Sequence, residues 1–469
     1  MKKWLRLLFD VQNELILISK WEIFAQSCDI ISSMSIKIAF HTLGCKVNQY
    51  ETEALKEKFV QKGYEIVSDE DRADIYVINT CTVTNLADRK SRQFIRKAKR
   101  LNEDAVIAVT GCYAETDPDE VSSIEGVSLV CGTGEKAELP KYIEEYMSEK
   151  GVVVEGAGDR ERLDSYHSDG IITGMDSRTR AYIKIEEGCD RFCSYCIIPY
   201  ARGKVRSRSL AEIKAETKGL IDRGFKEIVL TGINTALYGK DIGFDGIEPL
   251  IAELDAMPEN FRIRLSSLEP TVINKEQVRS LLKYKKLCPH LHLSIQSGSD
   301  NTLSTMSRRY TRQEYLEIVK ELRSFDPHYG ITTDIIVGFP GESDEDFAES
   351  ISVCDEAQFV KVHAFKYSPR RGTRAAEMKN QIHGELKNQR SQALISHAER
   401  VSEDFRRSCE GSIRTVLFEE FEGDALMCGY TDNYIRVYTQ ADESKLNEFC
   451  KVKLDKVYKD GMKGVIIDE

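Results

Sequence analysis

The sequence has 469 residues, a length that predicts roughly two to four domains with ample hydrophobic core. Hydrophobic residues make up 41% and charged residues 30%, which excludes a disordered chain, and no uncharged apolar run is long enough for a membrane span. The 66 basic and 77 acidic residues give a net charge of −11, so nucleic-acid binding would have to come from local basic patches.

Thirteen cysteines without a visible secretory signal argue against a disulfide framework. They favour a reducing cytoplasm in which thiolates bind metals or clusters, and we expect a cytoplasmic protein with no membrane partner. Residues 1–33 precede a strand-like run. They are either an extension outside the functional chain or an amphipathic helix packed on the first domain.

Short apolar runs alternate with helix-period segments over residues 34–147. The spacing predicts buried strands at 36–40, 74–81 and 105–112, with helices beginning near Gln49 and Asn85. Strands that alternate with helices predict an α/β domain with an open parallel sheet. Residues 148–177 lack apolar periodicity, and we expect them to form a linker.

Residues 178–403 repeat a pattern of one strand followed by one helix, which predicts a partial or full (β/α) barrel. The strand candidates are 181–189, 225–232, 261–270, 290–298, 331–341 and 359–369. Over residues 404–469 the pattern changes to short alternating strands, which predicts a small β-barrel. These strand candidates are 413–420, 425–431, 433–440 and 449–458.

Cys189, Cys193 and Cys196 form a C-x3-C-x2-C motif directly after the first predicted barrel strand. Three thiolates on one tight loop can hold three irons of a four-iron cluster and leave the fourth iron open to an added ligand. A structural zinc site would require a fourth ligand, and the nearest candidates are remote in sequence. We therefore favour a cluster over zinc.

The motif, with Tyr195 before its last cysteine and six βα units around it, resembles the radical S-adenosylmethionine enzymes. The resemblance implies that the amino acid part of S-adenosylmethionine chelates the open iron. It also implies that reductive cleavage of this cofactor yields a 5′-deoxyadenosyl radical, with a reductant such as flavodoxin or ferredoxin.

Cys45, Cys81 and Cys112 each fall at the carboxyl end of a predicted parallel strand, the edge at which open α/β sheets bind ligands. Three such cysteines cannot all pair as disulfides, and from position alone they are either a shared metal site or ordinary buried cysteines. Their surroundings resemble the methylthiotransferases, radical enzymes with two four-iron clusters, in the runs HTLGCKVNQYETE, INTCTVT, VTGCYAE and CDRFCSYCIIPYARGKVRSR.

This second resemblance covers nearly everything from Met34 to the end of the chain, and the C-terminal module resembles the TRAM RNA-binding domain. It implies that Cys45, Cys81 and Cys112 hold an auxiliary four-iron cluster that carries the inserted sulfur. One S-adenosylmethionine then methylates this sulfur. A second is cleaved to a radical that abstracts hydrogen from carbon 2 of an adenine, where the methylthio group bonds.

HTLGCKVNQYETE, with LTGIN followed by Tyr238 and Gly239, resembles the branch that acts on N6-threonylcarbamoyladenosine at position 37 of tRNA. The isopentenyladenosine branch typically has Gln and Met where Lys46 and Val47 stand, and the ribosomal-protein branch has Pro-Lys-Asn. Both remain alternatives within the same chemistry. An alternative from another class is a zinc-containing RNA-binding protein without catalysis.

Polar residues and glycines at the later strand ends are candidates to bind the cofactor. By position, Gly232 and Asn234 would face its amino group, and Ser294 and Gln296 its ribose. Capping of the following helices is an equally good explanation of each residue. The complete set of candidates is Tyr195, Gly232, Asn234, Ser267, Glu269, Ser294, Gln296 and Gly338.

Arg202, Lys204, Arg206 and Arg208 alternate directly after the first cluster loop, so on an extended segment they would line one face beside the active site. We expect this run to bind RNA. The substrate base must be presented outside a base stack, and an unpaired anticodon loop allows this at modest cost. We therefore expect the anticodon loop of tRNA as the partner. We also expect a monomeric enzyme. The C-terminal module is net acidic; it either binds RNA through a one-sided basic or aromatic face or serves as a structural lid.

Overall fold

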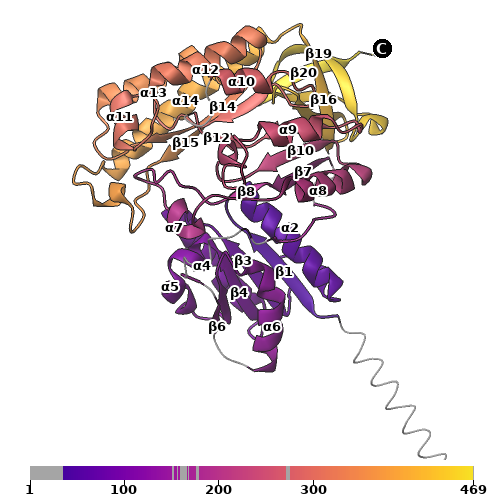
Figure 1. Ribbon diagram of the computed structural model, residues 1–469, viewed down its shortest axis with the longest axis vertical. Coiled ribbons are helices and arrows are strands. Elements are labelled where there is room, and N and C mark those ends of the chain that lie inside the picture. The colour runs from indigo at the N-terminus through magenta and orange to yellow at the C-terminus, as the bar shows by residue number, and fades with distance from the viewer. Residues whose placement is uncertain are drawn as a thin grey trace, which may run out of the picture.

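The computed structural model describes residues 35–149, 153–155, 157–158, 166, 168–175, 179–270 and 275–467. The predictions for residues 1–33 and for much of 148–177 lie outside these ranges. Figure 1 shows a sheet domain (indigo and purple) beside a central layer of strands and helices (magenta to orange), with a small barrel (yellow) on the far side of that layer. Within the described ranges, none of the helices is long and apolar enough to cross a membrane.

The first domain is a six-stranded sheet in the order β2-β1-β3-β4-β5-β6, and every neighbouring pair is parallel. Its strands are β1 (Lys37–Thr42), β2 (Glu65–Val67), β3 (Ile75–Thr80), β4 (Val106–Gly111), β5 (Leu129–Cys131) and β6 (Val153–Glu155). Its helices are α2 (Lys46–Gln61), α3 (Asn85–Leu101), α4 (Cys112–Thr116), α5 (Pro118–Ser122) and α6 (Leu139–Ser148). The open parallel sheet is confirmed.

The expectation of a linker over 148–177 is wrong for β6, which pairs with β5 in the register Leu129↔Val153. A three-residue edge strand is too short to produce a periodic signal. β2 and β5, equally short, were not expected either.

The central domain has two parallel sheets, in the orders β11-β10-β7 and β12-β13-β14-β15, and a two-stranded pair of β8 with β9. The third expected strand is divided at Ser266 into β11 and β12, which belong to different sheets. The strands are β7 (Arg180–Lys184), β8 (Glu186–Glu187), β9 (Arg206–Ser207), β10 (Glu227–Thr231), β11 (Arg262–Leu265), β12 (Ser267–Leu268), β13 (His290–Leu293), β14 (Gly330–Val337) and β15 (Lys361–Lys366).

The helices that follow these strands begin at local capping signals. Thr311 and Ser343 form capping boxes with residues three positions later, so two helix starts are specified by the nearby sequence. The helices are α7 (Ile198–Arg202), α8 (Leu210–Asp222), α9 (Glu248–Asp255), α10 (Lys275–Leu281), α11 (Asp300–Thr305), α12 (Arg312–Phe325), α13 (Asp344–Ala357) and α14 (Gly384–Ser408). α14 runs through the domain boundary expected at residue 403.

The strands divide their side chains between two environments. Ala181, Ile183 and Ile228 belong to the main hydrophobic cluster with residues of the surrounding helices. Successive residues of a strand point to opposite faces, so the alternate positions face away from these helices, toward the interior enclosed by the central strands. That interior is polar: His292 lies 2.9 Å from the Thr332 hydroxyl and 3.1 Å from Asp334.

The C-terminal module is a closed five-stranded barrel in the order β16-β17-β18-β20-β19. Its strands are β16 (Ile413–Glu422), β17 (Leu426–Thr431), β18 (Arg436–Gln440), β19 (Phe449–Tyr458) and β20 (Gly461–Ile466). The small β-barrel is confirmed, with β20 as a strand that the sequence pattern did not predict. The fold class, α/β with a terminal β-barrel, is therefore as expected.

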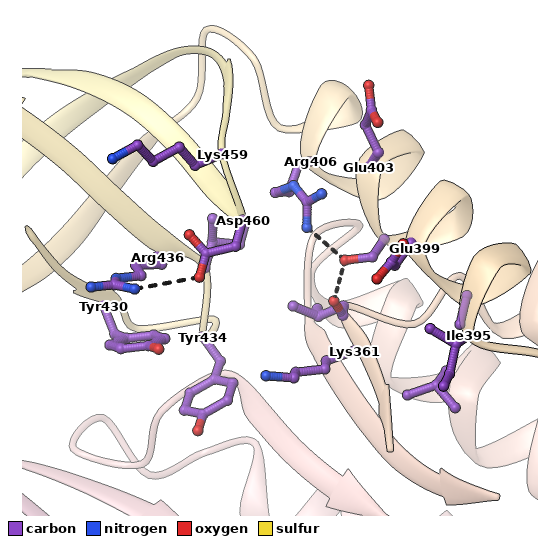
Figure 2. Close-up of a pocket in the computed structure, with 15 residues that line it drawn as sticks. Lys361, Ile395, Glu399, Glu403, Arg406, Tyr430, Tyr434, Arg436, Lys459 and Asp460 are labelled. Carbon is purple, nitrogen blue, oxygen red and sulfur yellow. Dashed lines mark hydrogen bonds and ion pairs between the residues drawn. The ribbon is translucent and has the colours of Figure 1, made fainter. Parts of the chain in front are cut away.

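This module packs against the amino ends of the central strands. Arg262 donates to the Tyr430 carbonyl at 3.0 Å, Arg264 donates to the Asp432 carbonyl at 3.1 Å, and the Tyr434 ring stacks on His290 with centroids 4.5 Å apart. A pocket of about 540 Å³ remains between the module, α14 and the start of β15 (Figure 2). The carboxyl ends of the strands, where the C-x3-C-x2-C motif lies, are at the opposite side.

Candidate active site

The C-x3-C-x2-C loop begins at Gly188, directly after β8. A Cβ atom at Gly188 would lie 1.8 Å from the Lys204 carbonyl oxygen, so only glycine permits this close approach of the two backbone segments. The amide of Cys189 donates to the Gly203 carbonyl at 3.0 Å, and that of Cys196 to the Cys193 carbonyl at 3.0 Å. The backbone therefore holds all three thiols on one compact loop.

Two side chains that the sequence analysis did not assign to this site, Arg308 and Phe339, contact the loop. Arg308 places Nη1 3.2 Å from the Cys193 sulfur and also donates to the Ser294 carbonyl. Tyr195 packs edge-on against Phe339, and burial raises its pKa well above the ordinary value. A guanidinium beside the thiols supplies the positive charge that thiolate ligands of a cluster would require.

Glu186, the first residue of β8, contacts two of the residues that were predicted to bind the cofactor. Its Oε1 accepts from the Asn234 amide at 2.6 Å, and a Cβ at Gly232 would lie 2.2 Å from the same oxygen. The Asn234 side chain donates to Glu269 at 2.8 Å, and Arg191 pairs with Glu269 at 3.0 Å. Burial raises the pKa of Glu186 to about 8.

Gly232 and Asn234 thus lie against the buried Glu186 carboxyl group, and Glu269 is joined to it through Asn234. Glu186 was missed from sequence, although its place three residues before Cys189, at the end of a strand, was an available signal. Ser267 lies beside this group, since its carbonyl accepts from the Thr235 hydroxyl at 3.0 Å.

Ser294 and Gln296 lie at a second group of polar atoms. The Ser294 hydroxyl donates to Asp334 at 2.9 Å, and the Gln296 amide donates to the Asp334 carbonyl at 2.8 Å. Gln296 has a φ of 69°, an uncommon value for a residue with a side chain. Gly338 packs against a different residue: a Cβ atom at this position would lie 2.4 Å from the aliphatic part of Lys387. Its glycine is explained by this packing and by a φ of 69°.

The other cysteine trio lies at the carboxyl edge of the first sheet, after the adjacent strands β1, β3 and β4. A Cβ at Gly44 would lie 2.7 Å from the Cβ of Cys81, which shows how closely the first two loops approach. Asn48 joins the loops by donating to the Leu43 and Thr80 carbonyls at 2.7 and 2.9 Å. Cys45 is exposed, whereas Cys81 and Cys112 are buried. Burial raises the pKa of Cys81 to about 12.

The run from Arg202 to Arg208 is not an exposed basic face. Arg206 is buried and pairs with Glu187 at 3.0 Å, while Arg208 is fully buried and pairs with Glu216 at 2.5 Å. Only the β9 part of the run is extended. Because β9 pairs with β8, the side chains of Arg206 and Arg208 point into the protein interior. The prediction that they bind RNA is therefore wrong. Lys204 is exposed, and its contact with RNA stays a prediction.

Arg202 is also wrongly predicted as an RNA contact, since its side chain is completely buried. Its two terminal nitrogens donate to Glu51 at 2.7 and 3.1 Å. Lys136 and Lys184 pair with the same carboxylate, so this buried network joins the first sheet domain to the central barrel. Charges in such a place require partners, which explains why the alternating basic residues point inward.

The donors at both trios suit a cluster better than a single ion. Within the described ranges, no three His, Cys, Asp or Glu side chains converge closely enough to ligate one metal ion. The thiolates of a four-iron cluster bind different irons and are spaced more widely. The zinc alternative therefore lacks a ligand set in the described part of the chain, whereas two trios of thiols, each beside an arginine, fit clusters.

A cavity of about 210 Å³ lies between the motif loop and the loop that follows Cys81. Val83 and Thr84 line it from the loop after Cys81, and Tyr195 and Cys196 line it from the motif loop. The carboxyl ends of β14 and β15 supply most of the remaining wall, including Asp334 and Lys366. A ligand in this cavity would be within reach of both cysteine loops.

Two family models match the chain: residues 37–132 match "Uncharacterized protein family UPF0004" and residues 183–354 match "Radical SAM superfamily". The threonylcarbamoyladenosine tRNA methylthiotransferase MtaB of Bacillus subtilis (strain 168) is 42% identical over 89% of this chain and 93% of its own length. The tRNA-2-methylthio-N(6)-dimethylallyladenosine synthase of Acetivibrio thermocellus is 33% identical over 91% of this chain and 90% of its own.

Among solved structures, the radical S-adenosylmethionine methyltransferase TsrM from Kitasatospora setae, with tryptophan and a cofactor analogue bound, is similar in fold. It has a TM-score of 0.53 and 16% identity, over 83% of this chain and 79% of its own. The relatives thus match both cysteine-bearing domains together, in one continuous alignment of nearly the whole chain.

Proposed function

The chain belongs to the threonylcarbamoyladenosine tRNA methylthiotransferases of the radical S-adenosylmethionine superfamily, and from this membership we propose how its two cysteine sites share the reaction. The protein is a tRNA-modifying enzyme that inserts a methylthio group at carbon 2 of N6-threonylcarbamoyladenosine at position 37. The observation that supports our proposal best is the cavity lined from both cysteine loops. Relatives that act on dimethylallyladenosine, at 33% identity, represent the alternative branch.

We propose that Cys189, Cys193 and Cys196 hold the cluster that binds S-adenosylmethionine, and that the other trio holds an auxiliary cluster. When bound, the first supplies the electron that cleaves S-adenosylmethionine and the second supplies the sulfur that is inserted. The Arg308 guanidinium, 3.2 Å from the Cys193 sulfur, offsets negative charge there. Electrons come from an external reductant such as flavodoxin or ferredoxin.

Two groups of polar atoms support our assignment of the S-adenosylmethionine contacts. Glu186, Asn234 and Glu269 form a buried acidic group that suits the cofactor's ammonium. Ser294 and Gln296, beside Asp334, are placed to orient its ribose hydroxyls. Contact of Gly338 and Ser267 with the cofactor stays a prediction.

The target base enters the cavity of about 210 Å³, which lies beside Cys196 and the loop after Cys81. The threonylcarbamoyl group carries a carboxylate. Lys366 is the single cation among the described residues that line the cavity, and its ammonium is held by the neutral amide oxygen of Asn388 at 2.8 Å. We assign Lys366 as the partner of the threonyl carboxylate, a group that an isopentenyl chain lacks.

The C-terminal barrel is proposed to be a TRAM-like module. Its tyrosines Tyr430 and Tyr434 lie against Arg180 and His290 of the central domain, which supports the structural-lid role. RNA binding by this module stays a prediction, as do a monomeric state and a cytoplasmic location.

The experiment that tests this function uses the full chain, with iron and sulfide reconstituted, S-adenosylmethionine and a reductant. Anticodon stem-loops with threonylcarbamoyl- or isopentenyladenosine, and ribosomes, are offered separately. Methylthiolation of the threonylcarbamoyl substrate alone is expected. Product on the isopentenyl substrate or on a ribosomal protein would overturn the substrate assignment, and colourless protein that copurifies with zinc would overturn the chemistry.

A further inference from the structure

Arg202 connects the two cysteine trios. It ends α7, the short helix that begins two residues after Cys196, and its side chain crosses into the first domain. There, Nη2 donates to the Asn48 side-chain oxygen at 2.7 Å. Asn48 is the residue that ties the loop of Cys45 to the end of β3, so Arg202 is bonded to the frame that holds the auxiliary trio.

The guanidinium also lies close to one of the thiols. The Asn48 oxygen that accepts from Arg202 lies 3.8 Å from the Cys45 sulfur, so the guanidinium and this thiol share one acceptor. The side chain is completely buried, and its Nε has no hydrogen-bond partner within the described structure. A buried N–H without an acceptor is costly, unless a ligand supplies one.

We propose that Arg202 is a positioning residue for the auxiliary cluster, which it holds at a higher reduction potential through its buried positive charge. This inference rests on the proposed assignment of the auxiliary trio. Reduction adds one negative charge to a cluster, so a nearby buried cation favours the reduced form. Because Arg202 ends the helix that begins two residues after Cys196, movement of the first cluster loop would displace Arg202 and change the charge near the auxiliary site.

The test is a redox titration followed by electron paramagnetic resonance on the full chain in which Cys189, Cys193 and Cys196 are replaced by Ala, so that only the auxiliary cluster is loaded. Arg202→Met is expected to retain iron and to shift the equilibrium toward the oxidised form by at least tenfold, which corresponds to 59 mV for one electron. Arg202→Lys, which keeps the charge, should restore most of the potential.

Two further variants separate charge from looser packing. Glu51→Gln removes a negative charge from the same network and should shift the potential in the opposite direction. Arg208→Met, which removes a buried arginine of the same segment that pairs with Glu216 rather than with Glu51, should leave the potential unchanged. A structural defect would not produce opposite signs.

Several results would overturn the inference. These are an unchanged potential in Arg202→Met, or equal shifts in Arg202→Met and Arg208→Met. If Arg202→Met loses its iron, an unchanged potential in Glu51→Gln overturns the inference in the same way. If the parent protein with the intact auxiliary trio binds no iron, the proposed function fails first, and the inference fails with it.

Discussion

Replacement of Lys366 by Met tests how the enzyme recognises its substrate. The ammonium is exposed and is held by an amide oxygen rather than by a carboxylate, so its charge is available to a ligand. An ion pair at an exposed site contributes about 0.2–1 kcal/mol. The substitution should therefore lower kcat/KM for the threonylcarbamoyl substrate by up to about fivefold, through KM.

The assay compares two anticodon stem-loops, one with the natural threonyl carboxylate and one with its methyl ester. Lys366→Met should weaken the first and leave the second nearly unchanged, because the ester carries no charge to pair. Lys361→Met is the matched control: this lysine begins the same strand and lines the other pocket (Figure 2), so neither substrate should be affected. Equal losses on acid and ester would refute the pairing.

Three further predictions concern the clusters and the buried charges. Cys45→Ala should abolish methylthiolation and keep S-adenosylmethionine cleavage, whereas Cys193→Ala should abolish both. Analysis of modified nucleosides and of 5′-deoxyadenosine measures the two activities. Methylthiolated product from Cys45→Ala would refute the role of Cys45. Glu51→Gln leaves buried cations unpaired and should cost about 3–5 kcal/mol in urea unfolding followed by circular dichroism. Glu144→Gln, at an exposed pair, should cost at most about 1 kcal/mol, and equal costs would contradict the burial argument. Burial opposes ionisation of Glu227, but two adjacent arginines hold its pKa well below the usual range. Its contribution to folding stability is therefore fully present above about pH 4 and is lost as the pH falls. Glu227→Gln should make the acid-unfolding curve less steep, and an unchanged curve would contradict this.

The sequence predicted the elements whose signals are local. The strands before Cys45, Cys81 and Cys112 are continuous apolar runs, and parallel pairing then brings their ends to one edge. The glycine at 188 and the cysteine spacing likewise describe one loop. Short edge strands such as β6 were missed because three residues carry no periodicity.

The charged residues could not be placed from sequence, because their partners are distant in the chain. Arg202 meets Glu51 across 151 positions, and nothing near either residue indicates that pairing. An alternating basic run is the same pattern whether it faces solvent or a buried carboxylate. Lys366 was missed for a similar reason, because its relevance depends on a cavity that only the packed domains create.

The most direct test of the central claim is mass spectrometry of digested tRNA nucleosides from cells with and without this gene. The account predicts that 2-methylthio-N6-threonylcarbamoyladenosine is present with the gene and is replaced by N6-threonylcarbamoyladenosine without it. Persistence of the methylthio nucleoside after deletion in a strain with no second such gene would contradict the assigned reaction.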